Sequence, residues 1–336
     1  MTYRKSLTQN GLYVLIDGVN NGGHRHEDAN SILRLSFMNR NWLMENDYTK
    51  PQQKFHNSLL MLVNGEAFSL PDYVELLSSG SNDELSWAFI RANDVGPAVW
   101  TRHVFWLHDE EAMVVIDKLS AKSAAHFQLK QRWNGVGDCQ LRNDGIHLSQ
   151  QGPALRLQCW QGTQLSTVED SELGKGWAKY PYAQPIAHVF DQMFSGTIPA
   201  GGHAMLGVVI HGVASGDVPP WSFSRTDNGF ELDTGKKKHV VTFMDNSMVD
   251  FTSPSDNHLT EPPPRPAATA ATFDGRQLDA AVICTGKSPF TKILPIQNRL
   301  FATTKTGDVF GFDMDGNAVS SFSVNAQINE DRKSVV

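Results

Sequence analysis

The chain has 336 residues, a formal net charge of −7 at pH 7 and 40% hydrophobic residues. This composition excludes a disordered chain and provides enough apolar side chains for a large core or for several domains. The negative charge and the absence of large Lys/Arg clusters argue against nucleic acid as a partner. The sequence contains no run of about 18 apolar residues, which a membrane-spanning helix would need.

Short strand-like segments recur along the first 250 residues and predict a mostly β chain. Gly, Asn, Asp and Pro residues separate them, and residues 126–133 alternate between apolar and polar types, as in a strand with one buried face. The segments are residues 12–17, 31–37, 58–63, 113–117, 126–133, 154–160, 205–212 and 239–244. Helical periodicity is weak, with at most one short helix at residues 70–78. We therefore predict an all-β fold, a large antiparallel β-sandwich over residues 1–255.

The remaining residues differ in composition. Residues 256–272 are rich in Pro, Ala and Thr and predict a linker. Within residues 273–336, strand-like runs are separated by Thr306-Gly307-Asp308 and by Asp315-Gly316. This pattern resembles one blade of a PQQ-like β-propeller. Because a propeller needs about four or more blades, a truncated propeller and a small β-meander are both open, and the pattern implies no cofactor.

The strongest chemical signal is a pair of histidines, His24 and His26, in a glycine-rich segment followed by Asp28. If residues 24–37 form one strand, these three side chains share a face. Solvent-exposed loop histidines are the alternative interpretation.

An antiparallel meander through a candidate strand at residues 41–44 would bring an acid, Glu45 or Asp47, and then His56 back beside His26. Two histidines and one carboxylate form a three-ligand site with an open position, which suits zinc. A metal-bound histidine needs an acceptor on its other nitrogen, and Asp28 or Asn57 could supply it.

A cupin is a competing metal-binding fold, because it also uses a His-x-His pair with an acid and a distant histidine. Its acid normally follows the second histidine within a few residues. Ala29 and Asn30 occupy those positions here, which disfavours a cupin.

Three segments carry a family resemblance. They are Gly-His-Arg-His-Glu-Asp-Ala-Asn-Ser at residues 23–31, Trp-Leu-Met-Glu at residues 42–45, and His-Asn-Ser-Leu-Leu-Met-Leu-Val-Asn-Gly at residues 56–65. The sequence resembles the C-terminal half of heparinase II/III-like polysaccharide lyases over roughly residues 10–250. Weaker matches are an Arg-x-Val strand containing Arg102 and a Val-Val-x-Asp-x-Leu strand containing Asp117.

The resemblance implies a β-sandwich that accompanies an α/α toroid and cleaves uronate-containing polysaccharides by β-elimination. By position, His24 matches the histidine that faces the substrate, and His26 and His56 match zinc ligands. The acidic ligand corresponds to Glu45, with Asp47 as the alternative. The family's principal tyrosine–histidine acid/base pair belongs mainly to the toroid, so Tyr48 is the local tyrosine that could reach a substrate.

Candidate substrate-binding residues are Arg25, Arg102 and Trp177. Either arginine could bind a substrate carboxylate through two hydrogen bonds, although the alternating strand around Arg102 also fits a structural ion pair. Trp177 lies in a loop-like segment with Tyr180 and Tyr182 and is a candidate saccharide platform. The strand tryptophans are predicted to lie in the core; they are Trp87, Trp100, Trp106, Trp133 and Trp160.

These observations favour a polysaccharide lyase, or its zinc-bearing sandwich half, with Zn²⁺ in a structural or substrate-orienting role. The alternatives are a non-catalytic carbohydrate-binding module with a zinc site and, second, a cupin-like metal oxygenase. The expected partners are an acidic polysaccharide and a toroid domain outside this chain, not nucleic acid or a membrane. The resemblance implies a periplasmic or secreted location, although the first ten residues lack the apolar region of a signal peptide.

Overall fold

A computed structural model of the chain describes residues 1–243 apart from residues 7, 9, 21–25, 46–50, 161 and 170–186. Beyond residue 243 it describes the backbone of strands at residues 249–252, 272–273, 276–277, 290–296, 299–304, 308–312 and 318–323. The chain divides into two compact units, Met1–Leu259 and Thr260–Val336. Among the described residues, no helix has the length and apolar character to cross a membrane.

The first large sheet is antiparallel and has nine strands, in the order β1-β2-β3-β4-β11-β16-β15, with β5 paired to β11 and β6 paired to β5. Its strands are β1 (Thr2–Arg4), β2 (Tyr13–Ile16), β3 (Ile32–Phe37), β4 (Arg40–Met44), β5 (Leu59–Val63), β6 (Glu66–Ala67), β11 (Ala125–Val136), β15 (Gln164–Glu169) and β16 (Ala187–Ile198). A single 3₁₀ turn, η1 (Gln53–Phe55), lies between β4 and β5.

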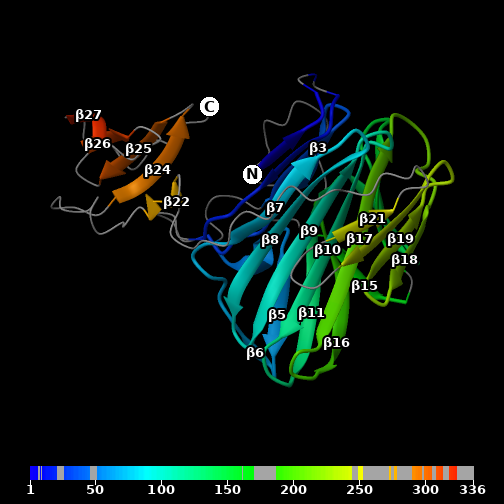
Figure 1. Ribbon diagram of the computed structural model, residues 1–336. Coiled ribbons are helices and arrows are strands. Elements are labelled where there is room, and N and C mark those ends of the chain that lie inside the picture. The colour runs from blue at the N-terminus through cyan, green and yellow to red at the C-terminus, as the bar shows by residue number, and fades with distance from the viewer. Residues whose placement is uncertain are drawn as a thin grey trace. The chain divides into compact units, whose positions relative to one another are not determined.

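The second large sheet has eight antiparallel strands, in the order β12-β13-β14-β17-β10-β9-β8-β7. Its strands are β7 (Glu75–Ser81), β8 (Leu85–Val95), β9 (Ala98–Leu107), β10 (Ala112–Ala121), β12 (Asp138–Arg142), β13 (Gly145–Ser149), β14 (Ala154–Cys159) and β17 (His203–Val213). Figure 1 shows this sheet stacked face to face on the first, with β8–β10 and β17 in one layer and β5, β11 and β16 in the other.

A smaller antiparallel sheet forms a third layer, in the order β18-β19-β20-β21. Its strands are β18 (Ser222–Thr226), β19 (Gly229–Asp233), β20 (Lys238–Phe243) and β21 (Val249–Thr252). Phe223 and Phe230 of this sheet belong to one apolar cluster with Phe105 and Trp160 of the second large sheet. Burying aromatic side chains of this size is a major stabilising contribution, because each removes a large apolar area from water.

The space between the two large sheets is filled by side chains that alternate inward along each strand. Trp42 and Trp133 of the first sheet share a core cluster with Trp106 and Val115 of the second. A second cluster at another part of the sandwich includes Trp100 and Phe127. Four of the five strand tryptophans predicted as core residues are buried, and Trp87 is partly buried.

The C-terminal unit contains a two-stranded pair, β22 (Thr272–Phe273) and β23 (Arg276–Gln277), and a four-stranded antiparallel meander. The meander runs in sequence order through β24 (Phe290–Ile296), β25 (Arg299–Thr304), β26 (Asp308–Phe312) and β27 (Ala318–Ser323). The prediction of a propeller blade stays a prediction, and most of the predicted linker lies outside the described residues.

The predicted all-β sandwich is confirmed, and each of the predicted strand segments contains or overlaps a strand. Residues 70–78, for which at most one short helix was expected, contain no helix; β7 starts at Glu75 and pairs with β8. One local expectation was wrong. Residues 26–31 are loop rather than the start of β3, because Asn30 adopts a left-handed backbone conformation with φ 66° and Ser31 N–H closes a turn onto Asp28 O.

Candidate metal site

The candidate site lies at a break in the first large sheet. Strand β11 pairs with β5 along Phe127–Gln131 but meets β4 only at Gly135. The chain that joins β4 to β5 is fixed to β11 between these two pairings. Arg132 N–H donates to Ser58 O at 2.8 Å, and Asn134 N–H donates to the side-chain Oδ1 of Asn57 at 2.6 Å. An asparagine side chain therefore replaces a ladder hydrogen bond where the sheet is interrupted.

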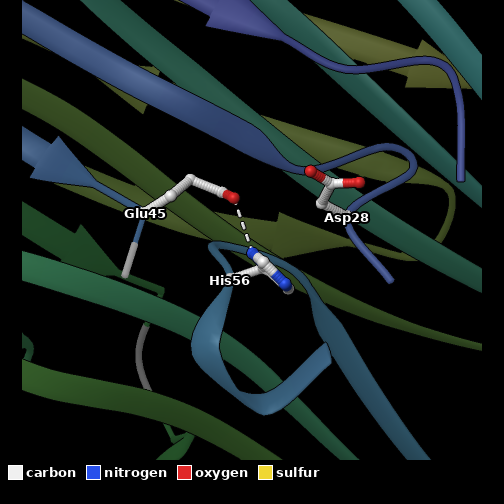
Figure 2. Close-up of side chains that lie close together, drawn as sticks. All are labelled: Asp28, Glu45 and His56. Atoms are coloured by element: carbon white, nitrogen blue, oxygen red, sulfur yellow. Dashed lines mark hydrogen bonds and ion pairs between the residues drawn. The ribbon is translucent and has the colours of Figure 1, made fainter. Parts of the chain in front are cut away.

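Three side chains meet at this break. Asp28 comes from the loop before β3, Glu45 directly follows β4, and His56 follows the 3₁₀ turn η1. Each offers one ligand atom, and these atoms all lie within 4.8 Å of one another. Figure 2 shows the three side chains pointing toward a common centre. They form what we call the Asp28–Glu45–His56 cluster.

The tightest contact in the cluster joins Glu45 and His56. Nδ1 of His56 donates to Oε2 of Glu45 at 2.6 Å, the dashed line in Figure 2. His56 is 1% exposed and Glu45 15% exposed at their side chains. On the other side of the imidazole, Nε2 lies 3.4 Å from Pro51 O. The ring orientation is thus set by the carboxylate and by a backbone carbonyl.

Burial and mutual repulsion perturb the acids of the cluster. Burial raises the pKa of Asp28 to about 7, and the negative charges of Glu45 and Asp17 add to this rise. Burial also raises the pKa of Glu45, and the hydrogen bond with His56 opposes it. For His56, burial alone lowers the pKa, but the hydrogen bond and charge of Glu45, together with the charge of Asp28, raise it above its ordinary value.

The donor set fits a divalent cation. Oε1 of Glu45 is buried and has no hydrogen-bond partner among the described residues. The carboxylate therefore has an unused lone-pair position in a poorly solvated place, and a nearby cation would relieve that cost. The imidazole nitrogen and the carboxylate oxygens are ligand types that zinc accepts in proteins.

The structure brings together two of the three predicted metal ligands, Glu45 and His56. Asp28, which the sequence suggested as an acceptor for a metal-bound histidine, is the third member of the cluster. His26 lies beside it, with its ring centroid 6.0 Å from that of His56, and stays a predicted ligand. Asp17, at the end of β2, is a charged neighbour that sequence reasoning missed; its position at a strand end before the histidine segment was the available signal.

Several predicted site residues lie outside the described residues. They are the catalytic candidates His24 and Tyr48, the substrate-binding candidates Arg25 and Trp177, and the alternative acidic ligand Asp47.

Arg102 lies in the interior rather than at a substrate surface. Its side chain is 0% exposed, and Nε and Nη2 each donate to Asp117 at 2.8 Å. Arg102 therefore forms the structural ion pair that the alternating strand pattern indicated. The other interpretation, that Arg102 binds a substrate carboxylate, does not fit this position. A substrate carboxylate has no route to a guanidinium that is fully enclosed and already paired.

A groove of about 790 Å³ opens beside the cluster on the outer face of the first sheet. Its floor is formed by outward-facing residues of β5, β11 and β16. Glu27 and Gln53 line the end nearest the cluster, where Gln53 N–H donates to Glu27 Oε2 at 3.2 Å. Lys54 and Lys130 contribute exposed positive charges to its lining.

No protein-family model matches the chain, and no curated protein matches its sequence. Solved structures are similar to it in fold. The heparan sulfate lyase HepC from Pedobacter heparinus aligns with a TM-score of 0.56 at 12% identity, covering 75% of this chain and 40% of that chain. A structure of heparinase III aligns with a TM-score of 0.53 at 13% identity and the same coverage. The chain thus spans about 40% of the length of the lyases it matches, and what it shares with them is a β-sandwich fold.

Proposed function

We propose that this chain is the metal-bearing β-sandwich of a polysaccharide lyase that acts on uronate-containing glycans by β-elimination. The observation that carries the proposal is the Asp28–Glu45–His56 cluster, in which a buried histidine meets two partly buried acids and one carboxylate oxygen of Glu45 has no partner among the described residues. The similarity of the sandwich to heparan sulfate lyases supports the substrate class.

In β-elimination a base takes the weakly acidic proton at C5 of a uronate, a double bond forms between C4 and C5, and the bond from C4 to the leaving oxygen breaks as an acid protonates that oxygen. The negative charge that develops on the uronate carboxylate must be neutralised, and this electrostatic contribution is usually the largest in such reactions. When bound, a zinc ion supplies a fixed positive charge and orients the surrounding loops. In this chain, Glu45 and His56 would hold that ion with Asp28 or His26, and Lys54 and Lys130 would attract the acidic glycan. The family resemblance assigns His24 to the substrate side of this site and leaves Tyr48 as the local candidate for proton transfer, and both residues lie outside the described part of the chain.

The test of lyase activity uses the full chain with zinc and three substrates: heparan sulfate, chondroitin sulfate and alginate. Unsaturated uronate ends absorb in the ultraviolet, so we expect absorbance to rise with at least one substrate. His56→Ala abolishes the rise, while His203→Ala, which changes an exposed histidine on the second sheet, leaves it intact. Failure of every substrate to give product contradicts lyase activity for this chain.

A second candidate function is carbohydrate binding without cleavage, and the groove beside the cluster favours it. Amide side chains and lysines in a groove are suited to the hydroxyl and carboxylate groups of an acidic glycan. We expect the chain to be retarded in gels that contain heparan sulfate. The double substitution Lys54→Ala/Lys130→Ala weakens the retardation, whereas Lys122→Ala, at an exposed lysine outside the groove, does not. Equal retardation of all three proteins contradicts the assignment of the groove.

A further inference from the structure

The structure contains a buried ion pair on the second sheet whose hydrogen bonds extend to the first. Arg102 of β9 and Asp117 of β10 are adjacent across the ladder and are both fully buried. Asp117 also accepts from Trp100 Nε1 at 2.8 Å and from Gln131 Nε2 at 2.9 Å. Its two oxygens therefore receive four hydrogen bonds, and the carboxylate is held in a single orientation.

The remaining terminal nitrogen of Arg102 reaches the loops of the candidate metal site. Nη1 donates to Asn30 O at 2.7 Å and to Asn57 O at 2.9 Å. Asn30 follows Asp28 by two residues, and Asn57 follows His56 by one. A single guanidinium nitrogen thus links the backbone positions that carry two members of the cluster.

The third member is linked through Asn57. Its Nδ2 donates to Ile32 O at 2.8 Å and to Met44 O at 3.2 Å, and Met44 directly precedes Glu45. Asn57 is completely buried. The backbone next to each of Asp28, Glu45 and His56 is therefore connected to Arg102, either directly or through one asparagine side chain.

We propose that Arg102 is a positioning residue, which sets the separation of the loops that carry the Asp28–Glu45–His56 cluster. Two properties favour arginine for this role. Its planar guanidinium presents donors in a fixed fork, so it fixes the distance between the carbonyls it binds. A buried ion pair is a weak source of stability compared with apolar packing, so a role in fixing geometry accounts for its presence better than stability does. The consequence for metal binding rests on the proposed function; the positioning of the loops does not.

The test compares Arg102→Lys with Arg156→Lys. Arg156 is a matched control, because it also donates two hydrogen bonds to one acid, Asp144, and one to a backbone carbonyl, Val218 O, but has no hydrogen bond to the described residues of the cluster loops. Amide hydrogen exchange is measured on the metal-free proteins, together with the free energy of unfolding and the Kd for zinc.

For Arg102→Lys we expect amide exchange to accelerate by about tenfold or more in residues 28–32 and 56–58, while the paired strands β10 and β17 change little. The zinc Kd rises by about 10- to 100-fold, as for other residues that orient metal ligands. Arg156→Lys leaves exchange in the two loops and the zinc Kd at their unsubstituted values, even where its unfolding free energy falls.

The proposal is overturned if Arg102→Lys leaves the two loops as protected as before, or if exchange accelerates equally throughout both sheets. If Arg102→Lys does not fold, Gln131→Met loosens only the Asp117 end of the network, and the same two loops must then show the faster exchange. An unsubstituted protein that takes up no zinc contradicts the proposed function, whereas the exchange pattern still decides the role of Arg102.

Discussion

Two groups of buried charged side chains, one on each large sheet, are neutralised in different ways. In the Arg102–Asp117 pair both carboxylate oxygens are fully used, by donors from Arg102, Trp100 and Gln131. In the Asp28–Glu45–His56 cluster two acids share one imidazole, and Oε1 of Glu45 has no partner among the described residues. Both oxygens of Asp117 already accept hydrogen bonds, so this carboxylate cannot also bind a cation. The Asp28–Glu45–His56 cluster has an oxygen without a partner in the described part of the chain and two acids for one imidazole, so it can.

Two buried histidines show the same contrast. His103 of β9 packs between Phe89 and Phe243, and burial lowers its pKa to about 3. His56 is equally enclosed, but its acidic neighbours raise its pKa above the ordinary value. Burial in apolar surroundings keeps a histidine neutral, while burial among acids produces a site where positive charge is favourable.

The largest expected effect comes from breaking the saturated pair. Asp117→Asn keeps the shape of the side chain but leaves the charge of Arg102 buried without its counter-charge. We expect the free energy of unfolding to fall by about 3–5 kcal/mol, measured by urea denaturation. Asp94→Asn is the matched control, because Asp94 forms an exposed ion pair with Lys122, and it should cost less than about 1 kcal/mol. If the two variants lose similar amounts of unfolding free energy, the buried Asp117 does not neutralise Arg102 as described.

Removing a negative charge from the Asp28–Glu45–His56 cluster should raise the stability of the protein rather than lower it. Because the pKa of Asp28 is raised from 3.8 to about 7, the folded protein keeps a proton that the unfolded chain releases. Stability of the metal-free protein therefore falls as the pH rises through this window and levels off above pH 7. We expect Asp28→Asn to have a higher Tm than the unsubstituted protein at pH 8, with the difference shrinking toward pH 4. If Asp28→Asn has a lower Tm than the unsubstituted protein at pH 8, the excess of negative charge in the cluster is contradicted.

The smallest effect is expected at the surface. The hydrogen bond from Arg91 lowers the pKa of Glu75, so this acid contributes stability above its unfolded-state pKa and loses it as the pH falls through its folded-state pKa. We expect Glu75→Gln to lower the unfolding free energy by less than about 1 kcal/mol at pH 7, and the difference should vanish in acid. Its pH dependence is thus opposite in sign to that of Asp28→Asn, and thermal unfolding at several pH values compares the two directly.

The sequence predicted the sandwich well because alternating strands such as residues 126–133 carry their burial pattern locally. It also predicted that Glu45 and His56 would meet, since both lie at the ends of strand-like segments. It did not predict the loop at residues 26–31, because the hydrogen bond that holds Asn30 O comes from Arg102, 72 positions away along the chain. For the same reason the sequence does not reveal that His103 is buried and packs against Phe243 of the third sheet.

The central claim is that the Asp28–Glu45–His56 cluster binds a divalent cation, and metal content tests it most directly. The purified chain is exposed to excess zinc, freed of unbound metal, and analysed for zinc per chain beside His56→Ala, Glu45→Gln and the surface control Asp94→Asn. We predict about one zinc per chain for the unsubstituted protein and the control, and almost none for the two cluster variants. An unsubstituted protein without zinc, or a His56→Ala protein that retains it, would contradict the claim.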